Sequence, residues 1–378
     1  MYALTNCTIY TSQKILNEHA IIIENDLIKE IICNENLKKH IKCIDLQGAN
    51  ISAGFIDLQL NGCGGVMLNG AETEKTLEIM QATNLKSGTT SYLPTFITDA
   101  DEGIKRMLKV TRNYMQKHKN EVLGLHLEGP YLSIEKKGIH CPEYIREADP
   151  DMIHHICQNS DVVSILTLAP ENNSKETIQA LCNSNIIVAL GHTNATYAQA
   201  KEGIDNGISC ATHLFNAMTS MEGRAPGVIG AIYDNNIYAG VIVDGFHVAY
   251  ESIRISKKIM GEKLYLVTDA TAAAGSNIDS FDFVGTTINY KSGKCTGPDG
   301  SLGGSAVTMI ESIQQMVKFV GVELDEALRM ATLYPAKAIS VDHRLGSIMP
   351  GKIANLAVFT SDYKVLATIV NGNYNATI

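Results

Sequence analysis

Four residues whose side chains bind metal ions or move protons each stand at the end of a short apolar run. Glu128 ends the run LGLHLE, His192 and His213 follow IIVALG and SCAT, and Asp269 follows LYLVT. The carboxyl ends of parallel barrel strands meet at one end of the barrel, where active sites lie. Two imidazoles and a carboxylate are the protein ligands of catalytic zinc sites. The pattern therefore predicts a hydrolytic metal centre.

Each of these residues also has a plainer interpretation. A histidine in a buried strand is often a hydrogen-bonded core residue, and an aspartate after a strand often caps the next helix. Gln59 and Asn61 alternate on one face of an earlier apolar run. Neutral amides bind zinc poorly, so these two predict a site for a single metal ion, with the amides as accessory groups. They are equally compatible with simple hydrogen bonding in the barrel mouth.

The elements that must position these residues form a regular series between residues 54 and 270. Helix-like amphipathic segments such as 71–88 and 101–118 separate most of the apolar runs. Buried parallel strands alternating with helices predict an α/β fold, a (β/α)8 TIM barrel. The eight predicted strands are GFIDLQL, TSYLPTF, VLGLHLE, VVSILTLA, IIVALGH, SCATHLF, YAGVIVDG and LYLVTDA. After them the sequence predicts a long loop at 271–285, strand-like residues at 286–295, and helices over 308–320 and 324–340.

The two ends of the chain have a different pattern. Residues 1 to about 50 and the tail after about residue 343 contain short alternating strands and polar turns. We expect both ends to form one small β-sandwich domain, from residues 1–52 and 343–378, beside a barrel of residues 53–342.

Composition excludes several classes of function. The net charge is −9 and no basic run occurs, so we expect no nucleic-acid partner. The apolar stretches are shorter than the roughly 20 residues of a membrane helix, so we expect no membrane partner. The nine cysteines are scattered without a CxxC pair, which predicts reduced thiols and no cysteine metal cluster. The N-terminus lacks the pattern of a signal peptide, so we expect a cytoplasmic location.

Eight motifs in order make a family resemblance visible. They are GFIDLQLNGCGG (54–65), LHLEGPYLSIEKKGIH (125–140), LGHTNAT (190–196), THLFNAM (212–218), GRAPGVIGA (223–231), DGFHV (244–248), LVTDATAAAG (266–275) and LYPAKAI with LGSIMPGKIANL (333–339 and 345–356). With these motifs the chain resembles the amidohydrolase superfamily and, within it, the N-acetylglucosamine-6-phosphate deacetylase family. It departs from the superfamily where Gln59-Leu60-Asn61 replaces His-x-His, and where Ala354-Asn355-Leu356 replaces the usual Ala-Asp-Leu.

The resemblance implies roles for individual residues. Glu128, His192 and His213 would bind one divalent metal ion, expected to be zinc. Asp269 would act as general base and then acid, and His140 would donate to the acetyl carbonyl. The substrate contacts it implies come from His140, Asn216, Ala217, Arg224, His247 and Leu302.

The implied reaction is hydrolysis of N-acetyl-D-glucosamine 6-phosphate to D-glucosamine 6-phosphate and acetate, in amino-sugar catabolism and cell-wall sugar recycling. The resemblance also implies a homodimer or dimer-based oligomer, and it leaves open whether Arg224 acts in its own site or in the partner's. One alternative is deacetylation of a related substrate, such as N-acetylgalactosamine 6-phosphate or an N-acyl amino acid. Another is a non-catalytic interaction protein on the same barrel; it would be expected to have lost the ligands or Asp269, which are all present.

Overall fold

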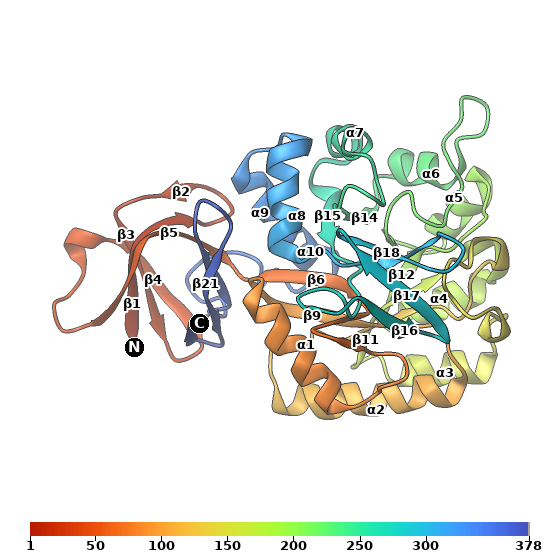
Figure 1. Ribbon diagram of the computed structural model, residues 1–378, viewed down its shortest axis with the longest axis horizontal. Helices are drawn as coiled ribbons and strands as arrows, with labels where there is room; N and C mark the ends of the chain where they lie inside the picture. The colour runs from red at the N-terminus through yellow and green to blue at the C-terminus, as the bar shows by residue number, and fades with distance from the viewer. Residues whose placement is uncertain (377–378) are drawn as a thin grey trace.

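Eight parallel strands form a nearly closed barrel in the computed structural model, which describes residues 1–376 (Figure 1). Each strand pairs with the next along the chain, and the first and last meet at the bridge between Leu60 and Ala270. The predicted α/β barrel is therefore confirmed. Its strands are β6 (Phe55–Leu60), β9 (Thr89–Ile97), β10 (Leu125–Glu128), β11 (Val163–Leu168), β12 (Ile187–Leu190), β13 (Cys210–Ala211), β14 (Tyr238–Ile242) and β15 (Leu264–Val267).

The strands are buried along almost their whole length, because helices cover the outside of the barrel. Polar side chains cap several helix starts: Thr73 accepts from the backbone of Thr76, and Thr196 forms a capping box with Gln199. The helices are α1 (Glu74–Lys86), α2 (Asp101–Lys117), α3 (Pro150–Gln158), α4 (Lys175–Asn183), α5 (Tyr197–Asp205), α6 (Gly227–Asn235), α7 (Tyr250–Met260), α8 (Met309–Gln315), α9 (Leu324–Ala331) and α10 (Leu333–Ala338).

Two predicted helices differ in detail from those observed. The helix expected over residues 308–320 is α8 followed by a π-helical turn, Met316–Val320. The helix expected after residue 323 is divided into α9 and α10 at Thr332, whose backbone dihedrals (φ −133°, ψ −74°) are not helical. Periodicity alone does not reveal such a break, because the apolar spacing continues across it.

The two ends of the chain combine, as predicted, on one side of the barrel (Figure 1). Their strands hydrogen-bond into a mixed eight-stranded sheet in which β5 pairs with β1 and β20. Alternate residues of one strand, such as Ile21 and Ile22, face two different apolar clusters. The strands are β1 (Tyr2–Tyr10), β2 (Ile15–Leu16), β3 (His19–Glu24), β4 (Leu27–Cys33), β5 (Lys42–Ala53), β20 (Leu356–Phe359), β21 (Val365–Val370) and β22 (Asn373–Ala376). The proposed domain boundaries stay a prediction, and residues 377–378 of the last one lie outside the described residues.

A four-stranded antiparallel sheet follows the last barrel strand and contributes to the barrel mouth. It consists of β16 (Ser280–Phe283), β17 (Thr286–Lys291), β18 (Lys294–Thr296) and β19 (Leu302–Ser305). Ser305 N donates to Asp269 O at 2.9 Å, which fastens β19 to the end of β15. A small hairpin, β7 (Gly62–Cys63) and β8 (Val66–Met67), follows β6. Among residues 1–376, no helix has the length and apolar character needed to cross a membrane.

Candidate active site

Four barrel strands bring the predicted chemical residues to one end of the barrel. Glu128 is the last residue of β10, and His192, His213 and Asp269 each come two residues after their strand. The backbones of the last three are left-handed, with φ of 46°, 31° and 49°. Residues other than glycine rarely adopt this conformation, and such strain gathers at functional sites. It turns the three side chains back toward the barrel axis.

Glu128, His192 and His213 meet in a tight buried triangle. His192 Nε2 and His213 Nε2 lie 3.1 Å and 2.9 Å from Glu128 Oε1, and the two nitrogens are 3.0 Å apart. His192 Nδ1 donates to the Lys136 carbonyl at 2.8 Å, so Nε2 is the nitrogen that carries the lone pair in the neutral ring. The lone pair of His192 Nε2 therefore faces the lone pairs of Glu128 Oε1 unless a proton or a metal ion lies between the two atoms.

The triangle fits a divalent metal ion. Four-coordinate zinc with ligands at about 2.0–2.2 Å places neighbouring ligand atoms about 3.3 Å apart. The three atoms are 2.9–3.1 Å apart, slightly closer than that spacing. Burial alone would raise the pKa of Glu128, but its contacts with both histidines hold that pKa well below the usual value. A carboxylate that stays ionised in the barrel is a suitable metal ligand.

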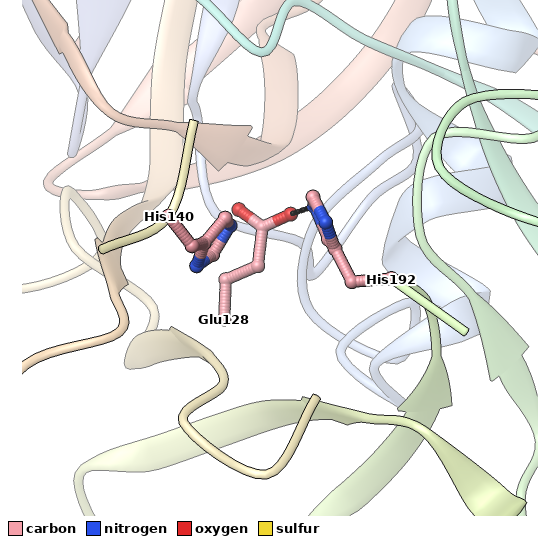
Figure 2. A group of neighbouring side chains, drawn as sticks. All are labelled: Glu128, His140 and His192. Atoms are coloured by element: carbon pink, nitrogen blue, oxygen red, sulfur yellow. Dashed lines mark hydrogen bonds and ion pairs between the residues drawn. The ribbon is translucent and has the colours of Figure 1, made fainter. Parts of the chain in front are cut away.

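His140 lies on the other side of the same carboxylate. Ligand atoms of Glu128, His140 and His192, all buried, lie within 4.8 Å of one another, and Figure 2 shows the three side chains converging. The His140 and His192 rings are 4.3 Å apart, and His140 Nδ1 lies 2.8 Å from Thr98 Oγ1. Three histidines thus surround Glu128, two of them as expected metal ligands and the third as the expected carbonyl donor. Burial, followed by the neighbouring His192, lowers the pKa of His140 well below its ordinary value.

Two amides connect Glu128 to Asp269. Gln59 Nε2 lies 3.1 Å from Glu128 Oε1 and 3.2 Å from Asp269 Oδ1, and Asn61 Nδ2 donates to Asp269 Oδ1 at 2.6 Å. Both amides turn N–H groups toward carboxylates, an arrangement that suits hydrogen bonding rather than metal ligation. Burial, with the Glu128 carboxylate nearby, raises the pKa of Asp269 to about 6. A carboxyl group with such a pKa can accept and return a proton near neutral pH.

A cavity of about 170 Å³ opens above these groups. Five of the six residues that the resemblance implies for substrate contacts line it: His140, Asn216, Ala217, His247 and Leu302. Within residues 1–376, no lysine or arginine lines this cavity, and the exposed Arg224 lies outside it. A single chain therefore does not bring Arg224 to the other predicted residues.

His247 is held firmly at the edge of the cavity. Its Nδ1 lies 2.6 Å from Asp244 Oδ2, and Asp244 Oδ1 accepts from the backbone of Phe246 and His247. Burial would raise the pKa of Asp244, but these contacts outweigh it and the pKa lies below its usual value. The ring nitrogen left free, Nε2, is available to a ligand.

Sequence reasoning missed part of the cavity wall. Ile97, Ile139 and Phe283 supply apolar surface, and Gly138 and Gly304 approach through their backbones. Ile139 lies beside the predicted His140, so its position along the chain was a usable signal. Phe283 had no such signal in the sequence, because it lies in β16, in a segment expected to be a loop.

His126, two residues before Glu128 in β10, is a structural residue. Both its ring nitrogens are hydrogen-bonded inside the barrel, Nδ1 to Leu58 O at 3.0 Å and Nε2 to Thr167 Oγ1 at 2.7 Å. It is therefore a satisfied interior residue below the metal site, as its position in β10 predicts.

The sequence matches known families over nearly its whole length. Residues 50–374 match the amidohydrolase family, and residues 1–51 match the NagA composite domain. The N-acetylglucosamine-6-phosphate deacetylase of Haemophilus influenzae is 54% identical over 376 residues, covering 99% of each chain.

Solved structures agree with the sequence matches. The crystal structure of N-acetylglucosamine-6-phosphate deacetylase from Pasteurella multocida is 56% identical, covers 100% of both chains and has a TM-score of 0.98. A mutant of the Mycobacterium smegmatis N-acetyl-D-glucosamine-6-phosphate deacetylase, in complex with N-acetyl-D-glucosamine-6-phosphate, is 28% identical, covers 100% of this chain and 99% of that chain, and has a TM-score of 0.93. The chain therefore belongs to the amidohydrolase family, in the branch that contains the N-acetylglucosamine-6-phosphate deacetylases.

Proposed function

We propose that this chain hydrolyses N-acetyl-D-glucosamine 6-phosphate to D-glucosamine 6-phosphate and acetate. The observation that carries the proposal is the buried triangle of Glu128, His192 and His213 beside the proton-transfer group Asp269. Whole-length similarity to deacetylases of this substrate supports it. The reaction belongs to amino-sugar catabolism and cell-wall sugar recycling.

In this proposal Glu128, His192 and His213 hold one divalent ion, expected to be zinc. When bound, that ion supplies Lewis-acid polarisation and lowers the pKa of a water molecule. His213 is preferred to His140 as the third ligand because its Nε2 is 2.9 Å from Glu128 Oε1 and 3.0 Å from His192 Nε2. His140, steadied at Nδ1 by Thr98, is left to donate from Nε2 to the acetyl carbonyl.

The proton transfers are assigned to Asp269. Its carboxylate takes a proton from the attacking water and then gives it to the departing amine of the sugar. Asn61 and Gln59 keep its Oδ1 beside Glu128 during both steps. His140 stabilises the negative charge that develops on the carbonyl oxygen. One proton of the water passes through Asp269 to the amine, and the other stays on the new carboxyl group, which releases it to solvent as acetate forms. Asp269 ends the cycle as the carboxylate that began it.

The phosphate is assigned to His247 of the same chain and to Arg224 of a second copy. The cavity wall described in residues 1–376 contains no lysine or arginine, although a phosphate dianion is best bound by cationic donors. The exposed Arg224 belongs to the loop between β13 and α6, so a homodimer would let it reach the neighbouring cavity. Asn216, Ala217 and Leu302 complete the proposed substrate contacts. A cytoplasmic location is part of the proposal, consistent with nine free cysteines.

A substrate panel tests the proposed function. Acetate release should be fastest with N-acetyl-D-glucosamine 6-phosphate, slower with N-acetyl-D-galactosamine 6-phosphate and unphosphorylated N-acetylglucosamine, and lost on chelation of the metal. Faster release from an N-acyl amino acid, or turnover that does not respond to chelator, contradicts the proposal. The galactosamine isomer is the proper control for the sugar, because it differs only in the position of one hydroxyl.

A further inference from the structure

The weakest pairing between neighbouring barrel strands is that of β6 with β15, and this seam lies beside Asp269. In the described part of the chain, neighbouring barrel strands are joined by ladders, but β6 and β15 share the single bridge Leu60–Ala270. Three backbone bonds cross the seam: Asp269 N donates to Gln59 O at 2.9 Å, and Asn61 N and Gly62 N donate to Ala270 O at 2.9 Å and 3.0 Å. The segment that presents Asp269 is therefore held to β6 by a few bonds and not by a continuous ladder.

The side chain of Asp57 spans this seam. It is 1% exposed and points from β6 to the residue that precedes Asp269. Asp57 Oδ1 accepts from Thr268 N at 3.2 Å, and Asp57 Oδ2 accepts from Thr268 Oγ1. One buried carboxylate thus holds both polar groups that Thr268 can offer as donors, and it does so from the opposite strand.

Asp269 needs such support because of its backbone. Its φ is 49°, a left-handed conformation that is strained for a residue other than glycine and persists only where neighbours enforce it. Ser305 Oγ donates to Thr268 O at 2.6 Å, and Ser305 N donates to Asp269 O at 2.9 Å. Asp57 thus holds the N–H and hydroxyl groups of Thr268, while Ser305 holds the carbonyl groups of Thr268 and Asp269.

Asp57 also fixes the group that touches the Asp269 carboxylate. Its Oδ1 accepts from Gln59 N at 3.2 Å, and the Gln59 side chain reaches Asp269 Oδ1 at 3.2 Å. Asp57 itself is outside the residues that line the cavity. It therefore holds Thr268, the residue before Asp269, and the main chain of Gln59 without facing the cavity.

We propose that Asp57 is a positioning residue that acts through Thr268 to keep Asp269 in its left-handed, catalytically aligned conformation. The inference rests on the proposed role of Asp269. Since Asp57 touches neither cavity nor metal ligands, its loss should lower kcat while KM and metal content stay near wild type. Misplacement of a reacting group by about 1 Å costs up to ~10²-fold in rate.

Two variants of Thr268 test the contact between Asp57 and Thr268. Thr268→Val removes the hydroxyl that donates to Asp57 and keeps the shape of the side chain, whereas Thr268→Ser keeps the hydroxyl. We expect Thr268→Val to lower kcat by on the order of 10–10²-fold with unchanged metal content. Thr268→Ser should restore most of the rate. Equal kcat in the two variants would overturn the proposal.

A double-mutant cycle separates positioning from general destabilisation. Asp57→Leu removes all three hydrogen bonds, whereas Asp57→Asn keeps an acceptor for both backbone N–H groups. If Asp57 acts through Asp269, Asp57→Leu should slow wild type but have little further effect on Asp269→Asn. An equal rate loss in both backgrounds means that Asp57 is only structural. Should Asp57→Leu fail to fold, the comparison of Thr268→Val with Thr268→Ser decides between the two roles.

A crystal structure of Thr268→Val supplies a measurement that needs no substrate. The proposal expects the φ of Asp269 to leave the left-handed region or its carboxylate to move away from Asn61. An unchanged Asp269 in that structure contradicts it. This readout stays valid if the substrate panel disproves the proposed function, so the two failures are distinguishable.

Discussion

Replacing Asp57 by asparagine should change how the stability of the protein depends on pH. Burial raises the pKa of Asp57 from 3.8 to about 7, because the interior disfavours the charged form more than the hydrogen bonds from Thr268 and Gln59 favour it. A carboxyl group whose pKa is raised by folding binds its proton more tightly in the folded chain. The stability it contributes is full below about pH 3.8 and is lost as the pH rises through about 7.

The size of the effect follows from the same values. A pKa difference of one corresponds to about 1.4 kcal/mol, so ionising Asp57 costs the folded chain about 4 kcal/mol at pH values above 7. Most of this loss falls between about pH 5 and pH 8, where it is about 2–3 kcal/mol. Asparagine cannot ionise, and it fits the site: its oxygen can accept from both backbone N–H groups and its amide can donate to Thr268 Oγ1. The advantage of Asp57→Asn over wild type should therefore grow by about 2–3 kcal/mol across this range.

Urea unfolding measures the difference in unfolding free energy between Asp57→Asn and wild type. Far-UV circular dichroism is the suitable probe, because the chain has no tryptophan for fluorescence. Both proteins should carry the same metal load. Asp26→Asn is the matched control, since Asp26 is an exposed carboxylate in the turn between β3 and β4. A gap between Asp57→Asn and wild type that stays constant or shrinks as the pH rises would refute the reasoning.

Three further predictions concern the reaction. With amides at Gln59 and Asn61, elemental analysis should find about one divalent ion per chain, and a second full-occupancy ion bound to those amides would disprove the one-metal site. Asp269→Asn should lower kcat by at least ~10² while the metal is retained, and near-normal turnover would assign the proton transfers elsewhere. Arg224→Ala should lower kcat/KM about 10–200-fold with the phosphorylated sugar and far less with N-acetylglucosamine, whereas an equal loss with both makes the arginine structural. If Arg224 crosses between subunits, hybrids of Arg224→Ala and Asp269→Asn chains should regain partial activity, because one site per hybrid keeps both residues; inactive hybrids place Arg224 in its own subunit.

The regular parts of the fold were predictable because their signal is local. Seven of the eight barrel strands lie within the apolar run that predicted them, and β9 extends one residue beyond its run at each end. A strand buried on both faces reads as a continuous apolar stretch. Glu128, His192, His213 and Asp269 were found for the same reason: polar residues at the ends of such runs are conspicuous. In the sheet β16–β19, the strand-like residues 286–295 predicted β17 and most of β18. β16 was not predicted, because it is short and partly exposed and lies in a segment expected to be a loop.

Details of the site depend on contacts between distant residues. The Thr98 partner of His140 is 42 positions away, and Asp57 lies 211 positions from Thr268. Neither pair follows a spacing rule, since the barrel brings together whichever strands are neighbours in space. Arg224 is a similar case, because it lies outside the cavity of its own chain and its proposed role requires a second copy.

The sequence by itself determined the barrel, the combination of both chain ends and the residue types that surround the metal site. These follow from strand periodicity, from the order of the motifs and from the ligand preferences of metal ions. Only the tertiary structure decided that His140 lies against Glu128 and His192, that Gln59 and Asn61 donate to carboxylates, and that Arg224 lies outside its own cavity. The physical reason is that a side chain's partners depend on backbone direction at the strand ends. There the left-handed turns at His192, His213 and Asp269 direct the side chains, and sequence pattern does not encode those angles.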